Sequence, residues 1–157
     1  MEVDVINLSK MFNKTYAVNE VNLKIQKNKT LGLLGPNGCG KTTTIGMMLG
    51  LIKPTNGSIF IGGKDINKTD KNSILNLLNF ASPYIELPKK LTVRQNLEIY
   101  GRLYGVKNLH YRITEISEDL KLFPFLDKKT GELSSGQKNR ASLAKSLINR
   151  PKLLFLD

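Results

Sequence analysis

The sequence predicts an α/β fold, and three segments of the 157-residue chain carry that prediction. Thr30–Leu34 is a short apolar run without alternation, which is typical of a parallel strand covered on both faces. A glycine-rich loop and a helical pattern follow this run directly. A second apolar run, Leu153–Leu156, lies far downstream with further helical patterns between, so helices separate the strands of the expected sheet.

Other strands are expected before and after the glycine-rich loop. Glu2–Leu8 and residues 21–25 alternate between apolar and polar side chains, which indicates half-buried strands, and a turn at 27–29 closes the second. Ser58–Ile61 is predicted as a further strand. The apolar segment Ile74–Phe80 fits a helix or a strand equally well.

Four helices are predicted from apolar spacing and from capping signals. Two of them open with capping boxes, because Gln95 stands three residues after Thr92 and Gln137 three residues after Ser134. The other two run over Thr42–Leu51 and His110–Leu122.

The composition is that of a globular protein with a basic surface. Lys and Arg number 24 against 13 Asp and Glu, a formal charge of +11, but the basic residues are scattered along the chain. A solvated surface is therefore the simplest interpretation, and contact with lipid headgroups or a membrane-embedded partner is the alternative. No apolar run approaches the roughly 20 residues of a membrane span, no secretory signal opens the chain, and Cys39 alone cannot form an internal disulfide. These features predict a cytoplasmic protein.

The segment from Gly35 to Thr42 predicts a phosphate-binding loop, since it has the spacing G-x-x-x-x-G-K-[ST]. Its glycines permit backbone angles that turn successive N–H groups toward one anion, and the helix that follows adds its positive end. Lys41 can reach the β- and γ-phosphates, Thr42 can ligate Mg²⁺, and Thr43 can donate to a phosphate oxygen. A nucleoside triphosphate with Mg²⁺, ATP above all, is the expected ligand. Cys39 is either a small residue that fits the loop or a reactive thiol in it.

A second motif, Leu133–Gln137, gives the loop its context. It reads Leu-Ser-Ser-Gly-Gln at a helix start, between the phosphate loop upstream and the apolar run that ends in Asp157 downstream. With these motifs in this order, the whole chain resembles the nucleotide-binding subunit of ABC transporters, whose signature is usually written LSGGQ. The run Leu91–Leu97 with Tyr100–Gly105 is similar to the exporter-type branch that works with separate ABC-2 permeases.

The resemblance implies a fold and a set of site residues. The fold is a P-loop NTPase (RecA-like) core with an N-terminal antiparallel β subdomain and an inserted helical subdomain. Residues 1–82 and 128–157 would form the core, 83–127 the helical insertion, and 134–149 the adjoining signature helix, with the C-terminal part of the sheet missing. Lys41 and Asp157 would be catalytic, and Thr42 and Asp157 would hold Mg²⁺. The nucleotide-binding residues would be Phe12, which stacks on adenine (with Tyr16 as the alternative), Gly35, Pro36, Asn37, Gly38, Cys39, Gly40, Lys41, Thr42, Thr43, Ser134, Ser135, Gly136 and Gln137.

The resemblance also implies partners. Two subunits, identical or different, would pair head to tail, so that each ATP lies between one subunit's phosphate loop and the other's signature. Integral membrane permease subunits would dock on the helical insertion, which places the chain on the cytoplasmic face of the membrane. No nucleic acid is expected. Import and export, and the transported substrate, stay open.

The chain departs from the family pattern at three places. The Gln between core and insertion is absent near residue 82, where Ser82 or Glu86 is the candidate substitute, and Ser135 replaces a Gly of the signature. The family's general base follows the Walker B Asp, and its switch histidine lies further on, whereas this sequence ends at Asp157 and His110 is expected at the surface. ATP binding with poor hydrolysis is therefore predicted. A non-catalytic remnant or fragment, a soluble ABC ATPase acting on ribosomes or DNA, and a small-molecule kinase are the alternatives.

Overall fold

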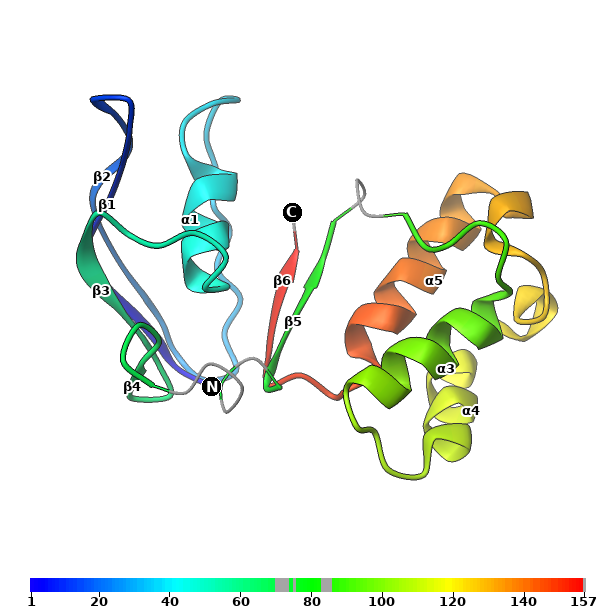
Figure 1. Cartoon of the computed structure of the whole chain (residues 1–157). Helices are drawn as coiled ribbons and strands as arrows, with labels where there is room; N and C mark the ends of the chain where they lie inside the picture. The colour runs from blue at the N-terminus through cyan, green and yellow to red at the C-terminus, as the bar shows by residue number, and fades with distance from the viewer. Residues whose placement is uncertain (70–73, 75, 83–85, 157) are drawn as a thin grey trace. The chain divides into compact units, whose positions relative to one another are not determined.

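The computed structural model describes residues 1–69, 74, 76–82 and 86–156, which belong to two compact units, Met1–Leu75 and Asn76–Asp157 (Figure 1). Each unit is described by itself below. No helix within the described ranges is long and apolar enough to cross a membrane.

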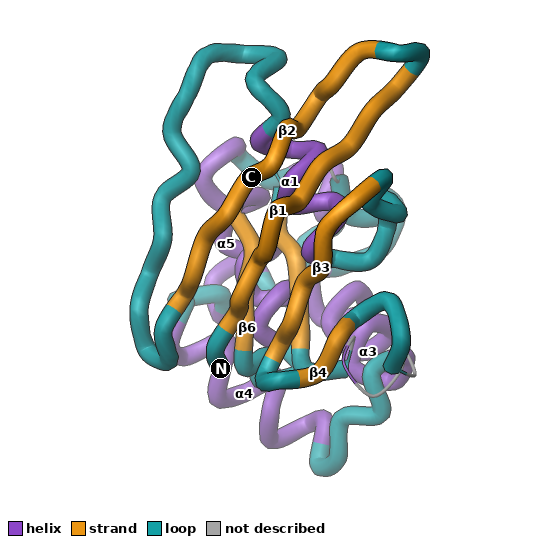
Figure 2. The backbone as a smooth tube through the Cα atoms, turned by 90° about the vertical axis from the view of Figure 1, so that its left-hand side faces the viewer, coloured by secondary structure: helices purple, strands orange, loops and turns teal. Residues whose placement is uncertain are grey.

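The first unit is built on an antiparallel sheet of four strands in the order β2-β1-β3-β4, which Figure 2 shows from its broad face. The strands are β1 (Val3–Phe12), β2 (Thr15–Ile25), β3 (Asn56–Ile61) and β4 (Lys64–Asp65). This sheet confirms the antiparallel β subdomain, although β1 extends four residues beyond the expected end at Leu8. The extension exists because Asn13 and Lys14, at φ 44° and 65°, form a two-residue hairpin turn whose twist matches the strands.

One face of the sheet is the core of this unit. Alternating residues of β1 and β3 are buried, and helix α1 (Lys41–Met48) packs beside the sheet and buries Met47 (Figure 1). The described residues of this unit that are at most 5% exposed are Val3, Val5, Leu8, Ser9, Val18, Met47, Met48, Ile59, Ile61 and Ile74. The helix is shorter than predicted: it ends at Met48, and Leu51 beyond it is 77% exposed.

The segment 30–34 contradicts the prediction of a buried strand. These residues form no strand, and Leu34 is 95% exposed. A strand requires a hydrogen-bonded neighbour, and no described strand pairs with this segment. Its apolar composition indicates that it favours burial, but composition does not supply the neighbour.

The second unit combines three helices with a two-stranded parallel sheet. Strand β5 (Leu78–Ala81) pairs with β6 (Leu153–Leu156), which confirms the downstream strand and shows that the ambiguous segment 74–80 becomes a strand from Leu78 onward. The helices are α3 (Val93–Leu103), α4 (Leu109–Asp119) and α5 (Ser135–Leu147). Short 3-10 turns at Phe123–Phe125 and Thr130–Glu132 lie between α4 and α5.

The three helices pack on one another around a common core (Figure 1). Val93 and Leu97 of α3 meet Ile113 and Ile116 of α4, and α5 contributes alanines that let the helices approach closely. The rest of this cluster is Leu122, Phe125, Leu126, Leu133, Ala141, Ala144 and Ile148. Arg94 of α3 also forms a two-pronged ion pair with Asp127, at 2.7 and 3.0 Å.

The core position Leu97 and the exposed position Leu103 on the same helix give a matched test of this packing. Leu97 is fully buried and Leu103 is 75% exposed. Leu97→Ala is expected to lower the free energy of unfolding by about 3 kcal/mol, because it leaves a cavity among α3, α4 and α5. Urea unfolding followed by circular dichroism measures the change. Leu103→Ala is the control, and equal costs for the two substitutions would contradict the packing described.

Candidate functional site

The phosphate loop ends where helix α1 begins, as predicted. Gly40 caps the helix with φ 93° and ψ 6°, and Thr44 donates the first helical hydrogen bond to the Gly40 carbonyl at 2.8 Å. The first N–H groups of any α-helix lack the acceptor one turn earlier that later N–H groups have, and no acidic side chain stands in the first turn of α1. The loop therefore faces a set of donors at the positive end of α1, which favours an anion.

Lys41 lies folded over the loop. Its Nζ donates to the carbonyl oxygens of Gly35 and Pro36, both at 2.8 Å, and lies 3.8 Å from the sulfur of Cys39. The ammonium is thus held at the loop by two neutral acceptors. A phosphate oxygen is a better acceptor for this ammonium than a neutral carbonyl oxygen, because it carries a charge of opposite sign.

The position of α1 against strand β2 requires glycine at residue 40. A Cβ there would run into the carbonyl oxygen of Ala17 and come within 3.0 Å of Val18 Cγ2, and the φ of 93° already disfavours a side chain. At Gly38, with φ 83°, the same Cβ would meet nothing within 4 Å. Gly40 therefore serves helix packing, whereas Gly38 lies at an open surface of the loop.

The aromatic residues predicted to stack on adenine lie at the β1–β2 hairpin, in the same unit as the loop. Phe12 and Tyr16 are each 48% exposed, so Phe12 is not an ordinary core residue. The ammonium of Lys10 lies 4.9 Å from the centre of the Phe12 ring, a contact that sequence reasoning missed. Because the two side chains are equally exposed, Phe12 and Tyr16 are both accessible for stacking on adenine.

The signature motif stands at the start of helix α5, as predicted. Ser134 Oγ accepts from the Gln137 N–H at 3.3 Å, and Gln137 Oε1 accepts from the Ser134 N–H at 3.0 Å. Ser134, Ser135 and Gly136 are exposed. The capping box thus presents the first N–H groups of α5 to solvent, and the extra side chain of Ser135 is accommodated there.

The two candidate substitutes for the missing Gln lie beside the signature. Ser82, which follows β5, is 7% exposed, and Glu86 forms an ion pair with Lys89 at 2.7 Å that lowers the pKa of the Glu86 carboxyl. Both line a pocket of about 210 Å³ together with Ser135 and Lys138 of α5. The two departures from the family pattern, at 82 and 135, therefore meet in one pocket. Residues 83–85 lie outside the described residues.

The remaining predicted site residues belong to different parts of the chain. Asp157 lies outside the described residues, directly after β6 in the sequence. The phosphate loop belongs to the first unit and the signature to the second. His110 is exposed on α4, as expected. No group of three metal-ligating side chains occurs within the described ranges.

The loop fits a nucleoside triphosphate by its own geometry: it combines glycines, a helix start and one lysine, and a Cβ at Gly38 would occupy open space. Comparison with known proteins gives the family. The model described as ABC transporter matches residues 18–157. The chain belongs to the ABC transporter family.

Curated relatives of this ABC transporter family member include both export and import proteins. It is 36% identical to Nod factor export ATP-binding protein I of Burkholderia lata, over 99% of this chain and 51% of that protein. It is 36% identical to the bacitracin transport ATP-binding protein BcrA of Bacillus licheniformis, over 99% and 50%. It is 34% identical to the xylose/arabinose import ATP-binding protein XacJ of Haloferax volcanii, over 99% and 41%. The chain spans about half or less of the length of these relatives.

Solved structures confirm the predicted fold class. An ATP-binding subunit of an ABC transporter matches 100% of the chain with a TM-score of 0.87 at 22% identity, covering 66% of that structure. The cbiO1 protein of Clostridium perfringens, part of the transporter complex cbiONQ, matches 99% with a TM-score of 0.86 at 26% identity, covering 64% of its chain. The α/β prediction, with a P-loop NTPase core and an antiparallel subdomain, is therefore confirmed.

The contrast between Gly40 and Gly38 predicts a difference in stability. Either substitution by Ala places a side chain at positive φ, which costs about 1–2 kcal/mol. Gly40→Ala adds the collision with the Ala17 carbonyl and is expected to lower the free energy of unfolding further. Urea unfolding of both variants measures the difference. Equal losses would show that α1 does not depend on close approach to β2.

Proposed function

We propose that this chain is the ATP-binding part of an ABC transporter, and that it binds MgATP at the phosphate loop. The observation that supports this most directly is the loop with Lys41 over two of its carbonyls at the start of α1. Lys41 would leave these carbonyls for the β- and γ-phosphates, and the N–H groups of the first turn would hold their oxygens. Phe12 or Tyr16 would stack on the adenine.

Mg²⁺ fits the donors that this chain offers. The hydroxyl of Thr42, in the first turn of α1, and the carboxylate of Asp157 would hold it, since both are the oxygen ligands that Mg²⁺ prefers. When bound, Mg²⁺ would neutralise charge on the phosphates. The remaining stabilisation would come from Lys41 and the loop N–H groups.

The signature supports a further step, in which two ATP-binding subunits pair head to tail. Ser134 and the N–H groups of Ser135 and Gly136 form an exposed helix start that would face the γ-phosphate of a nucleotide on the other subunit. ATP would then hold the pair together, and hydrolysis would release it.

Helix α3 offers a docking face for membrane subunits. Ile99 and Leu103, one helical turn apart, are 44% and 75% exposed, whereas Val93 and Leu97 face the core. Exposed apolar side chains at this spacing fit a helical segment of a partner. This arrangement supports the proposal that the helical insertion contacts permease subunits at the cytoplasmic face of the membrane.

Lys41→Ala tests the proposed function. The substitution removes a charge-assisted contact to phosphate and is expected to weaken MgATP binding roughly tenfold or more. Isothermal titration calorimetry measures the affinity, with circular dichroism to confirm that the variant is folded. Lys64→Ala, at an exposed lysine of β4 in the same unit, is the control and should bind as the unmodified chain does. Unchanged affinity in folded Lys41→Ala protein would refute the proposal.

A further inference from the structure

A second pocket, lined in part by basic residues, lies in the second unit. Its described lining contains none of the residues assigned to nucleotide binding or to the signature. It has a volume of about 420 Å³ and lies where the α3–α4 connection meets the end of α5. We call it the α4 pocket. Its charged lining residues are Lys107, Arg112 and Arg150, and Asn76, Asn108 and Tyr111 add polar groups.

Arg112 is fixed in the wall of the α4 pocket. Its side chain is only 11% exposed, and its Nε donates to the carbonyl of Ile148 at 3.2 Å. One terminal nitrogen donates to the carbonyl of Leu147, and the other to Glu115 at 2.9 Å. These bonds cap the last turn of α5 and hold the guanidinium in one orientation, so its position does not have to be ordered by a ligand.

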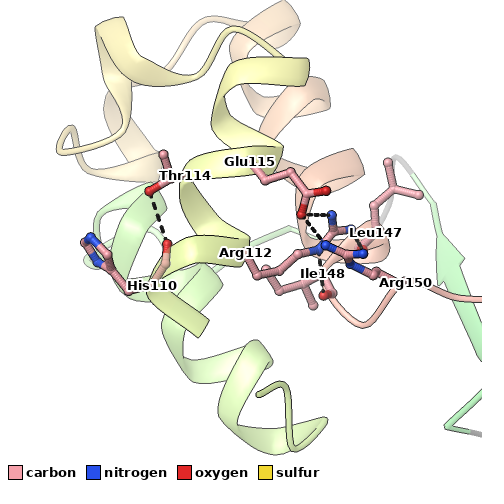
Figure 3. Close-up of polar contacts among 7 residues, drawn as sticks. All are labelled: His110, Arg112, Thr114, Glu115, Leu147, Ile148 and Arg150. Carbon is pink, nitrogen blue, oxygen red and sulfur yellow. Dashed lines mark hydrogen bonds and ion pairs between the residues drawn. The ribbon is translucent and has the colours of Figure 1, made fainter. Parts of the chain in front are cut away.

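The cations outnumber the carboxylates around the pocket. Glu115 Oε2 accepts from Arg112 and also from Arg150, at 2.6 Å, so one carboxylate serves two guanidinium groups. Figure 3 shows both guanidinium groups at this carboxylate, with His110 on the opposite side of α4. The hydrogen bond from Arg112 lowers the pKa of Glu115, which keeps it ionised at neutral pH. Lys107 adds a third cation, and no described lining residue is acidic. Against the single carboxylate of Glu115, the three cations leave a surplus of two positive charges.

We propose that the α4 pocket binds a small soluble molecule that carries a phosphate group. Arg guanidinium and Lys ammonium groups converging from three segments are the donors that phosphate oxygens prefer. The volume exceeds what a phosphate alone needs and lies within the range of small-molecule sites. The asparagine and tyrosine side chains would then contact the rest of the ligand. The pocket belongs to the second unit and contains no residue of the phosphate loop, so the inference does not depend on the proposed function.

The test uses inorganic pyrophosphate as the probe and the 157-residue Lys41→Ala protein as the background, which weakens phosphate binding at the loop. Titration at low salt is followed by calorimetry and by amide chemical shifts. Saturable binding is expected, with shifts at residues 107–112 and 148–150. Lys107→Gln and Arg150→Gln, both at exposed positions, should each weaken it roughly three- to tenfold. Glu115→Gln should strengthen it, because it removes the carboxylate that competes for the same guanidinium groups.

Lys128→Gln is the matched control, an exposed lysine of the same unit outside the pocket, and should leave the affinity unchanged. The proposal is overturned if pyrophosphate does not saturate, if Lys128→Gln weakens binding as much as Arg150→Gln, or if Glu115→Gln weakens it. A parallel arm uses phosphatidic acid vesicles against phosphatidylcholine vesicles. Adsorption that requires Lys107 and Arg150, without pyrophosphate binding, would assign the pocket to a membrane surface and overturn a soluble ligand.

Discussion

The approach of helix α1 to strand β2 is the constraint on which the phosphate loop depends. Gly40 lies so close to the Ala17 carbonyl that a single added carbon has no room. This approach fixes where α1 begins, and the start of α1 in turn fixes which N–H groups face the loop and from where Lys41 reaches its carbonyls. Protein interiors pack as densely as organic crystals, so neighbouring atoms have little room to adjust. A substitution that shifts α1 away from β2 would therefore also displace the loop.

Helix α5 is held at both ends by side chains, and its two ends serve different purposes. At the signature end, Ser134 and Gln137 exchange hydrogen bonds locally and leave the next N–H groups exposed. At the other end, Arg112 of α4 donates hydrogen bonds to the carbonyls of Leu147 and Ile148. The exposed end is therefore capped by its own residues, whereas the other end is capped by a neighbouring helix.

Local signals in the sequence predicted most elements of both units. The two capping boxes, at Thr92 and Ser134, were confirmed because their hydrogen bonds span only three residues and need no tertiary partner. The start of α1 directly after the glycine-rich segment was confirmed for the same reason. Apolar runs were less reliable: Leu153–Leu156 found a neighbour in β5, but residues 30–34 found none among the described strands. A run shows that a segment favours burial and says nothing about which strand will pair with it.

The sequence predicted where the contiguous motifs lie in the fold and did not predict contacts between distant residues. No spacing rule links Arg112 to the carbonyls of Leu147 and Ile148, more than thirty residues away. The meeting of Ser82 and Ser135 in one pocket likewise depends on the packing of α5 near β5. Such contacts appear only once the helices are assembled.

The folded-over position of Lys41 has a consequence for how quickly the loop can be filled. The ammonium of Lys41 bridges the carbonyls of Gly35 and Pro36 across the glycine-rich turn. For the proposed phosphate to bind, one flexible side chain would have to leave two neutral oxygens. That change would be a side-chain exchange, which takes place on the nanosecond scale or faster, and not the slower ordering of a backbone segment.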